Sequence, residues 1–137
     1  MLRREVMLRQ FLLVGVPMYL LFLQATAHHS ISVEYDMHTQ DTIEGVVSEV
    51  WFKAPHVRYY LAVTDKEGDQ VTWDTHGHNP VTLIRTGWMP DLIQVGDRIS
   101  ITGDVTRNGS PKLFIRTVEL ADGHVLVSHP GADNSVQ

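Results

Sequence analysis

Residues 56–75 read HVRYYLAVTDKEGDQVTWDT and contain the clearest strand pattern of the 137-residue chain. From Val57 to Val63 every second side chain is a large apolar one, which predicts a strand at residues 56–64 with one buried face. Residues 65–69 (DKEGD) are typical of a hairpin turn. Residues 70–75 return as a second strand with Val71 and Trp73 facing inward, so the sequence predicts a β-hairpin.

Upstream of this hairpin, a further strand is predicted at residues 42–51 (TIEGVVSEVW), where β-branched residues are frequent. Gly45 lies inside it and indicates a bulge or a sharp bend. Residues 31–40 are polar and mixed, without a sustained hydrophobic period. We expect them to form an extended lead-in.

Downstream, a short helix is predicted at residues 81–86. Asn79 suits the N-cap, Pro80 suits the first helical position, and Gly87 suits the end of the helix. This is the only helix expected after residue 27.

The remaining chain predicts three more strands. Residues 92–97 lead by a turn into a strand at 98–104, in which Ile99 and Ile101 alternate with polar residues and Gly103 permits a bend. The Asn-Gly pair at 108–109 is a strong turn signal before a strand at 113–120. A tight turn at 121–124 then leads to a short strand at 125–128.

This order of elements predicts an all-β fold over residues 28–128. Three strands, a short helix and two or three further strands match a small five- to six-stranded barrel of the oligonucleotide/oligosaccharide-binding (OB) type, with the helix between strands three and four. A small open β-sandwich is the competing arrangement. Residues 129–137 are poor in apolar side chains, which predicts a disordered tail.

Residues 1–27 have the layout of a secretory signal-peptide helix. A basic start is followed by the apolar residues 11–23 and by Ala25 and Ala27, an A-x-A cleavage pattern. Cleavage after Ala27 would make His28 the first residue of an exported, periplasmic or secreted protein. The alternative is a retained leader that serves as an anchor, although residues 11–23 are short for a membrane span.

The segment after Ala27 has eight Lys and Arg against fifteen Asp and Glu, a net charge of −7. Such an acidic surface repels phosphate backbones and argues against nucleic-acid binding. The chain has no cysteine, so no disulfide supports the fold. All eight histidines lie after Ala27, where about two or three would be ordinary. This excess favours metal binding or pH-dependent binding.

Several short motifs together resemble an uncharacterised bacterial family of domains of unknown function. They are Ala27-His28-His29-Ser30, Pro55-His56-Val57, Trp73, the helix region 79–88 and residues 95–103 (VGDRISITG). The resemblance implies a secreted, periplasmic-type domain with a small β-barrel. Family members carry Trp-x-Asn-Pro-His before the second strand, whereas this chain has FKAPH at residues 52–56, so the Asn is lost and His56 is kept.

The strongest candidate chemistry lies at the predicted mature amino terminus. A free α-amine has a pKa near 8, so a metal displaces its proton easily, and the His28 ring can then close a chelate. A third nitrogen would complete a site suited to copper(II). His56 is the candidate for that ligand. His29 could replace the His28 ring, and His76 with His78 forms a second pair whose i, i+2 spacing in a strand allows both rings to meet one ion.

A different class of function is a metal-independent module that binds a periplasmic protein or a small ligand. In this hypothesis an aromatic face around Tyr60 and Trp88 holds the partner. The chain lacks a Cys nucleophile, a G-x-S-x-G elbow, an HExxH motif and a Gly-rich phosphate loop, so nothing in it indicates a hydrolase. An oxidative copper enzyme is a third hypothesis, because a terminal-histidine copper site can activate oxygen, but no substrate surface is indicated and we do not expect an enzyme.

Overall fold

The computed structural model describes residues 30–128, and its strands all belong to the unit formed by residues 32–137. The elements are α2 (Ser30–Glu34), β1 (Tyr35–Trp51), β2 (Arg58–Thr64), β3 (Gln70–His76), α3 (Pro80–Arg85), β4 (Arg98–Thr106), β5 (Lys112–Glu119) and β6 (Val125–Val127). The predicted signal peptide and the predicted disordered tail lie outside the described residues.

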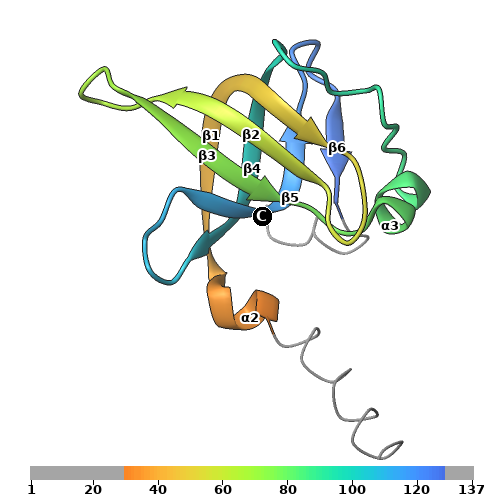
Figure 1. Cartoon of the computed structure of the whole chain (residues 1–137), viewed down its shortest axis with the longest axis horizontal. Coiled ribbons are helices and arrows are strands. Elements are labelled where there is room, and N and C mark those ends of the chain that lie inside the picture. The colour runs from red at the N-terminus through yellow and green to blue at the C-terminus, as the bar shows by residue number, and fades with distance from the viewer. Residues whose placement is uncertain (1–29, 129–137) are drawn as a thin grey trace, which may run out of the picture. The chain divides into compact units, whose positions relative to one another are not determined.

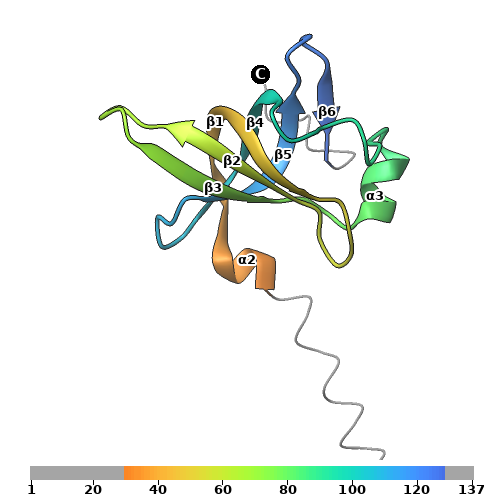
Figure 2. The same ribbon diagram turned by 45° about the horizontal axis from the view of Figure 1, so that its top comes forward.

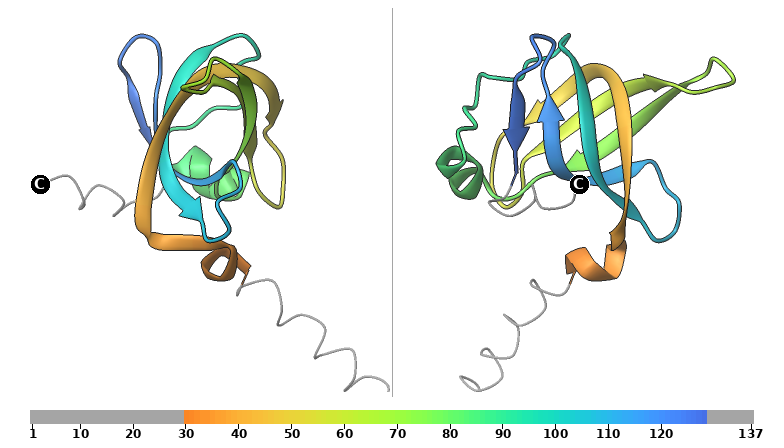
Figure 3. Two further views of the ribbon diagram at one scale, coloured as in Figure 1. Left: turned by 90° about the vertical axis from the view of Figure 1, so that its left-hand side faces the viewer. Right: turned by 180° about the vertical axis from the view of Figure 1, so that it is seen from behind.

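Five strands close into a ring (Figure 1). The sheet has the order β3-β2-β1-β4-β5-β6, and β3 also pairs with β5 in parallel, which closes the ring and leaves β6 paired with β5 outside it. The left view of Figure 3 looks through this ring. Strand content and the helix between the third and fourth strands confirm the predicted fold class.

The β2–β3 hairpin forms where the sequence predicted it and projects from the ring at its turn (Figure 2). Val57, Tyr59 and Leu61 are buried inside the ring, as the alternation requires. Gly68 in the turn has a φ of 92°, a left-handed conformation that favours glycine.

Helix α3 also matches its prediction. The Asn79 side chain accepts a hydrogen bond from the Thr82 backbone N–H at 2.9 Å, and Pro80 occupies the first turn. Leu83 on its inner side is fully buried, which attaches this short helix to the core.

The segment from residue 30 to residue 51 differs from the prediction in two features. The register shift lies between Val47 and Glu49, whereas Gly45 marks a close approach of strands: a Cβ there would lie 2.7 Å from the Ala62 carbonyl oxygen. Residues 30–34 form helix α2 instead of an extended segment, so α3 is not the only helix. Contacts with Arg107 and Lys112 hold this single turn, and a turn of that length does not persist on local propensity alone.

The core fills the ring with aliphatic and aromatic side chains from β1, β2, β4, β5 and β6, from α3 and from the connections before β2 and β4, and the partly buried Trp73 of β3 packs against them. Its buried members are Ile43, Val47, Val57, Tyr59, Leu61, Leu83, Trp88, Ile93, Ile99, Ile101, Leu113, Ile115, Val118 and Leu126. Within residues 30–128 no helix has the length and apolar character needed to cross a membrane.

Candidate functional site

Three of the histidines singled out from the sequence gather where β2 begins and β3 ends. The Val57 N–H donates to the His78 carbonyl at 3.1 Å, and the Gly77 N–H donates to the Val57 carbonyl at 2.7 Å. One step further, Arg58 pairs with His76. These backbone contacts bring His56 beside the pair His76 and His78 although about twenty residues separate them in sequence.

The His56 ring is half-buried, and a neighbouring carbonyl group determines which of its two nitrogens carries the hydrogen. Nδ1 lies 3.2 Å from the Gly77 carbonyl oxygen. A carbonyl oxygen only accepts, so Nδ1 carries the hydrogen, and in the neutral ring Nε2 keeps its lone pair. Metal-binding imidazoles are commonly held in this way, with the second nitrogen bonded to a carbonyl or a carboxylate.

The His76 ring is held by a carboxylate. Its Nε2 lies 3.1 Å from Oδ2 of Asp74, and its side chain is 13% exposed. Burial lowers the pKa of His76, and the adjacent Asp74 opposes that shift. With Nε2 donating to the carboxylate, Nδ1 of the neutral ring is the nitrogen with the lone pair.

An aromatic cluster surrounds the His76-Gly77-His78 segment. Tyr35 packs against His76 at a centroid distance of 5.9 Å, and His78 meets Phe114 edge-on at 5.1 Å. Tyr35 and Phe114 also contact each other, at 5.7 Å. Across residues 30–128, no group of three or more His, Asp or Glu side chains converges to hold a metal ion. His28 and His29 lie outside the described residues.

The two residues predicted to form an aromatic binding face are separated by the fold. Trp88 is 1% exposed, stacks on Tyr59 at 6.1 Å and donates from Nε1 to the Val127 carbonyl at 3.0 Å, so it is a core residue. A large side chain is needed there to fill the ring, which is why its assignment to the surface was wrong.

Tyr60, in contrast, lies on the outer side of β2. Its hydroxyl accepts a hydrogen bond from Arg58 Nη1 at 3.2 Å, and its ring meets Trp51 edge-on at 6.5 Å. Trp51 is 38% exposed, and the Lys53 ammonium lies 4.1 Å from the centre of its ring. The aromatic surface pair is therefore Tyr60 with Trp51.

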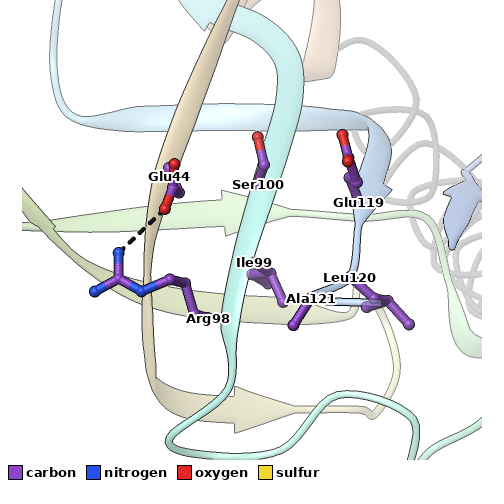
Figure 4. A pocket seen from close by; sticks show the side chains of 7 residues that line it. All are labelled: Glu44, Arg98, Ile99, Ser100, Glu119, Leu120 and Ala121. Carbon is purple, nitrogen blue, oxygen red and sulfur yellow. Dashed lines mark hydrogen bonds and ion pairs between the residues drawn. The ribbon is translucent and has the colours of Figure 1, made fainter. Parts of the chain in front are cut away.

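An open hollow lies on a different face, over β1, β4 and the end of β5 (Figure 4). Glu44, Ser100 and Glu119 form one row across three paired strands, and Glu44 is bonded to Arg98 at 3.1 Å. Two strand spacings separate the carboxylates by about 10 Å, too far for them to share a proton or an ion. None of the residues predicted from the sequence to bind a metal or a ligand lines this hollow.

Sequence reasoning missed Asp74 and Tyr35, the two residues that surround His76. Asp74 and His76 lie on the same, outer side of β3. Their i, i+2 spacing in a predicted strand could have indicated that the carboxylate lies beside the imidazole. Tyr35 precedes the predicted strand at 42–51, and no local pattern indicated its burial. Its hydroxyl is buried without a hydrogen-bond partner among the described residues, as is Oδ1 of Asp74.

Comparison with known proteins finds one family. A model described as a family of unknown function (DUF6152) matches residues 18–113. No curated protein matches the chain.

Proposed function

The chain belongs to the DUF6152 family of unknown function, and we propose that it is an exported metal-binding domain, periplasmic or secreted. In this proposal the metal is copper(II) or another divalent ion. The α-amine and ring of His28 bind it together with a nitrogen from His56, His76 or His78. The protein then serves as a metal carrier or accessory protein.

The observation that carries the proposal is the state of the His56 ring. Its Nδ1–H is engaged by the Gly77 carbonyl at 3.2 Å, which leaves Nε2 as a lone-pair donor without any rearrangement of the protein. The hydrogen-bonding pattern is the one found behind metal-bound imidazoles. His56 is also kept in this chain from the Trp-x-Asn-Pro-His pattern of the family, whereas the Asn is lost.

In this proposal a chelate formed by the mature amino terminus supplies the further metal ligands that His56, His76 and His78 do not provide. Among residues 30–128 the donors do not reach the number that a metal site needs. A free amine and its own imidazole provide two nitrogens at once, and copper(II) favours nitrogen donors in a planar arrangement.

The test compares two forms of the protein by calorimetric titration with copper(II). One form begins at His28 with a free α-amine, and the other is the same chain with that amine acetylated, which removes the amine as a ligand and leaves both rings in place. We expect the acetylated form to bind about tenfold more weakly or worse, because it loses one ligand of the chelate. Equal affinities would remove the amine from the site.

A third form, His29→Gln, separates the two neighbouring rings. If His28 provides the ring nitrogen, this form binds copper(II) as the unchanged protein does. If His29 replaces the His28 ring, the substitution weakens binding as much as acetylation of the amine does.

A second candidate function is a metal-independent binding module, and the outer aromatic pair of Tyr60 and Trp51 favours it. The Trp51 ring is exposed and already holds the Lys53 ammonium over its face. Such a surface suits a partner protein or a small ligand. Capture of a partner from periplasmic extract should survive chelation of metals and should be lost on Trp51→Ala. Loss on chelation would argue against this candidate.

A further inference from the structure

Two aromatic rings and a carboxylate lie together on the outer side of β1 and β2. Glu49 pairs with Tyr60 across the two strands, and Trp51 follows Glu49 at the i, i+2 spacing that points both side chains the same way. The Trp51 Nε1–H donates to Oε1 of Glu49, and the Trp51 and Tyr60 rings meet edge-on at a centroid distance of 6.5 Å. We call Glu49, Trp51 and Tyr60 the outer aromatic site.

An ammonium group already lies on this site. Lys53, near the start of the connection between β1 and β2, places its Nζ 4.1 Å from the centre of the Trp51 ring. The negative face of an indole attracts a cation in this position. Within residues 30–128 no ion pair joins Lys53 to a carboxylate. The ring is therefore the partner of this ammonium.

The charges around the site leave one carboxylate for a further cation. Arg58, which pairs with Trp51 across the strands, is held by Asp74 at 3.8 Å and donates to the Tyr60 hydroxyl at 3.2 Å. Glu49 accepts from the neutral indole N–H and takes part in no ion pair among the described residues. The whole chain has a net charge of −5. Both this carboxylate and the molecule as a whole attract a positively charged ligand.

The contact of Lys53 with the ring is weak enough to be exchanged. Lys53 and Trp51 are both exposed residues. At exposed positions a cation on an aromatic ring changes an equilibrium constant by a factor of about two to five. An ammonium group from outside the protein therefore displaces Lys53 at a small cost.

We propose that the outer aromatic site binds a lysine side chain of a basic partner protein, and that Lys53 occupies the site until the partner arrives. The inference rests on the second candidate function, the metal-independent binding module, and names the chemistry of its partner. Lys53 is the argument for lysine, because the ring already accepts a primary ammonium on a flexible stem. The negative charge of the chain favours a partner with several such groups.

The experiment titrates the protein with a tetralysine peptide and follows the indole Nε1–H signal of Trp51 by NMR. Trp51→Ala identifies this signal by its loss. We expect the signal to shift until the site is saturated. The same peptide with acetylated side chains carries no ammonium group and should leave the signal unchanged.

Four variants measure what each group contributes to the affinity for the peptide. Lys53→Gln should bind about two- to fivefold more tightly, because the internal competitor is gone. Lys66→Gln is the matched control, since it removes the same charge from an exposed position in the β2–β3 turn and should change the affinity less at about 0.15 M salt. Trp51→Ala and Glu49→Gln should both weaken binding.

Circular dichroism checks that each variant is folded. If Trp51→Ala does not fold, Lys53→Gln and Glu49→Gln still test the site. Peptide binding by Trp51→Ala as tight as by the unchanged protein would overturn the assignment. Equal gains in Lys53→Gln and Lys66→Gln would overturn it too, because net charge alone would then explain them.

Two further outcomes separate the ligand from the candidate function. Tetramethylammonium that shifts the Trp51 signal at the same concentrations as the peptide would assign the site to a small ammonium compound and overturn the protein partner. Capture of a partner that depends on Trp51 but is not prevented by the peptide would leave the second candidate function standing and overturn the choice of lysine. Peptide binding at the site without any captured partner would support the site and count against that function.

Discussion

Asp104 on β4 is a carboxylate with no exposure to solvent. Its Oδ2 accepts a hydrogen bond from Arg116 Nε at 2.9 Å. Burial raises the pKa of Asp104, and the Arg116 guanidinium opposes the shift without cancelling it. The folded protein therefore holds this proton more tightly than the unfolded chain does.

This difference predicts how stability depends on pH. Between the unfolded pKa of about 3.9 and the raised folded pKa, the folded state binds more protons, so Asp104 makes stability fall as pH rises through that interval. Asp104→Asn cannot ionise and should not show this fall. Urea unfolding of the unchanged protein and of Asp104→Asn between about pH 4 and 7 measures how the free energy of unfolding changes with pH. Glu119→Gln, at an exposed position, is the control. A constant difference between Asp104→Asn and the unchanged protein would contradict the assignment.

At the scale of elements, the local signals predicted the hairpin and helix α3 because their determinants lie within a few residues. Alternation buries Tyr59 and Leu61, and Asn79 caps the helix that follows it. Helix α2 was not predictable in this way. It depends on Arg107, which is 75 residues from Ser32 in sequence, so only the closed ring brings its contacts together.

The cap of α3 gives a test of this local determination. Asn79→Ala removes the acceptor for the Thr82 N–H and should lower the free energy of unfolding by about 1 kcal/mol. Asn79→Asp keeps an acceptor oxygen and should lose much less. Urea unfolding of the two variants measures the difference. Similar losses for both would show that the cap contributes little beside the burial of Leu83.

At the scale of the whole molecule, the sequence identified the candidate metal-binding histidines by residue type but did not predict which residues surround them. His56, His76 and His78 were visible as residues of the right type at the ends of predicted strands, and pairing of β2 with β3 gathers them. Asp74 and Tyr35 were missed, because their roles come from cross-strand contacts. Trp88 was placed on a surface, whereas closure of the ring buries it.

The proposed metal site depends on the α-amine of His28, which export and cleavage after Ala27 would create. The most direct test is the intact mass of the protein, expressed with its full leader in a bacterium and recovered from the periplasm, together with the sequence of its first residues. We predict the loss of residues 1–27 and a chain that begins His28-His29-Ser30. A retained leader, or cleavage at any other position, would contradict the proposed metal site.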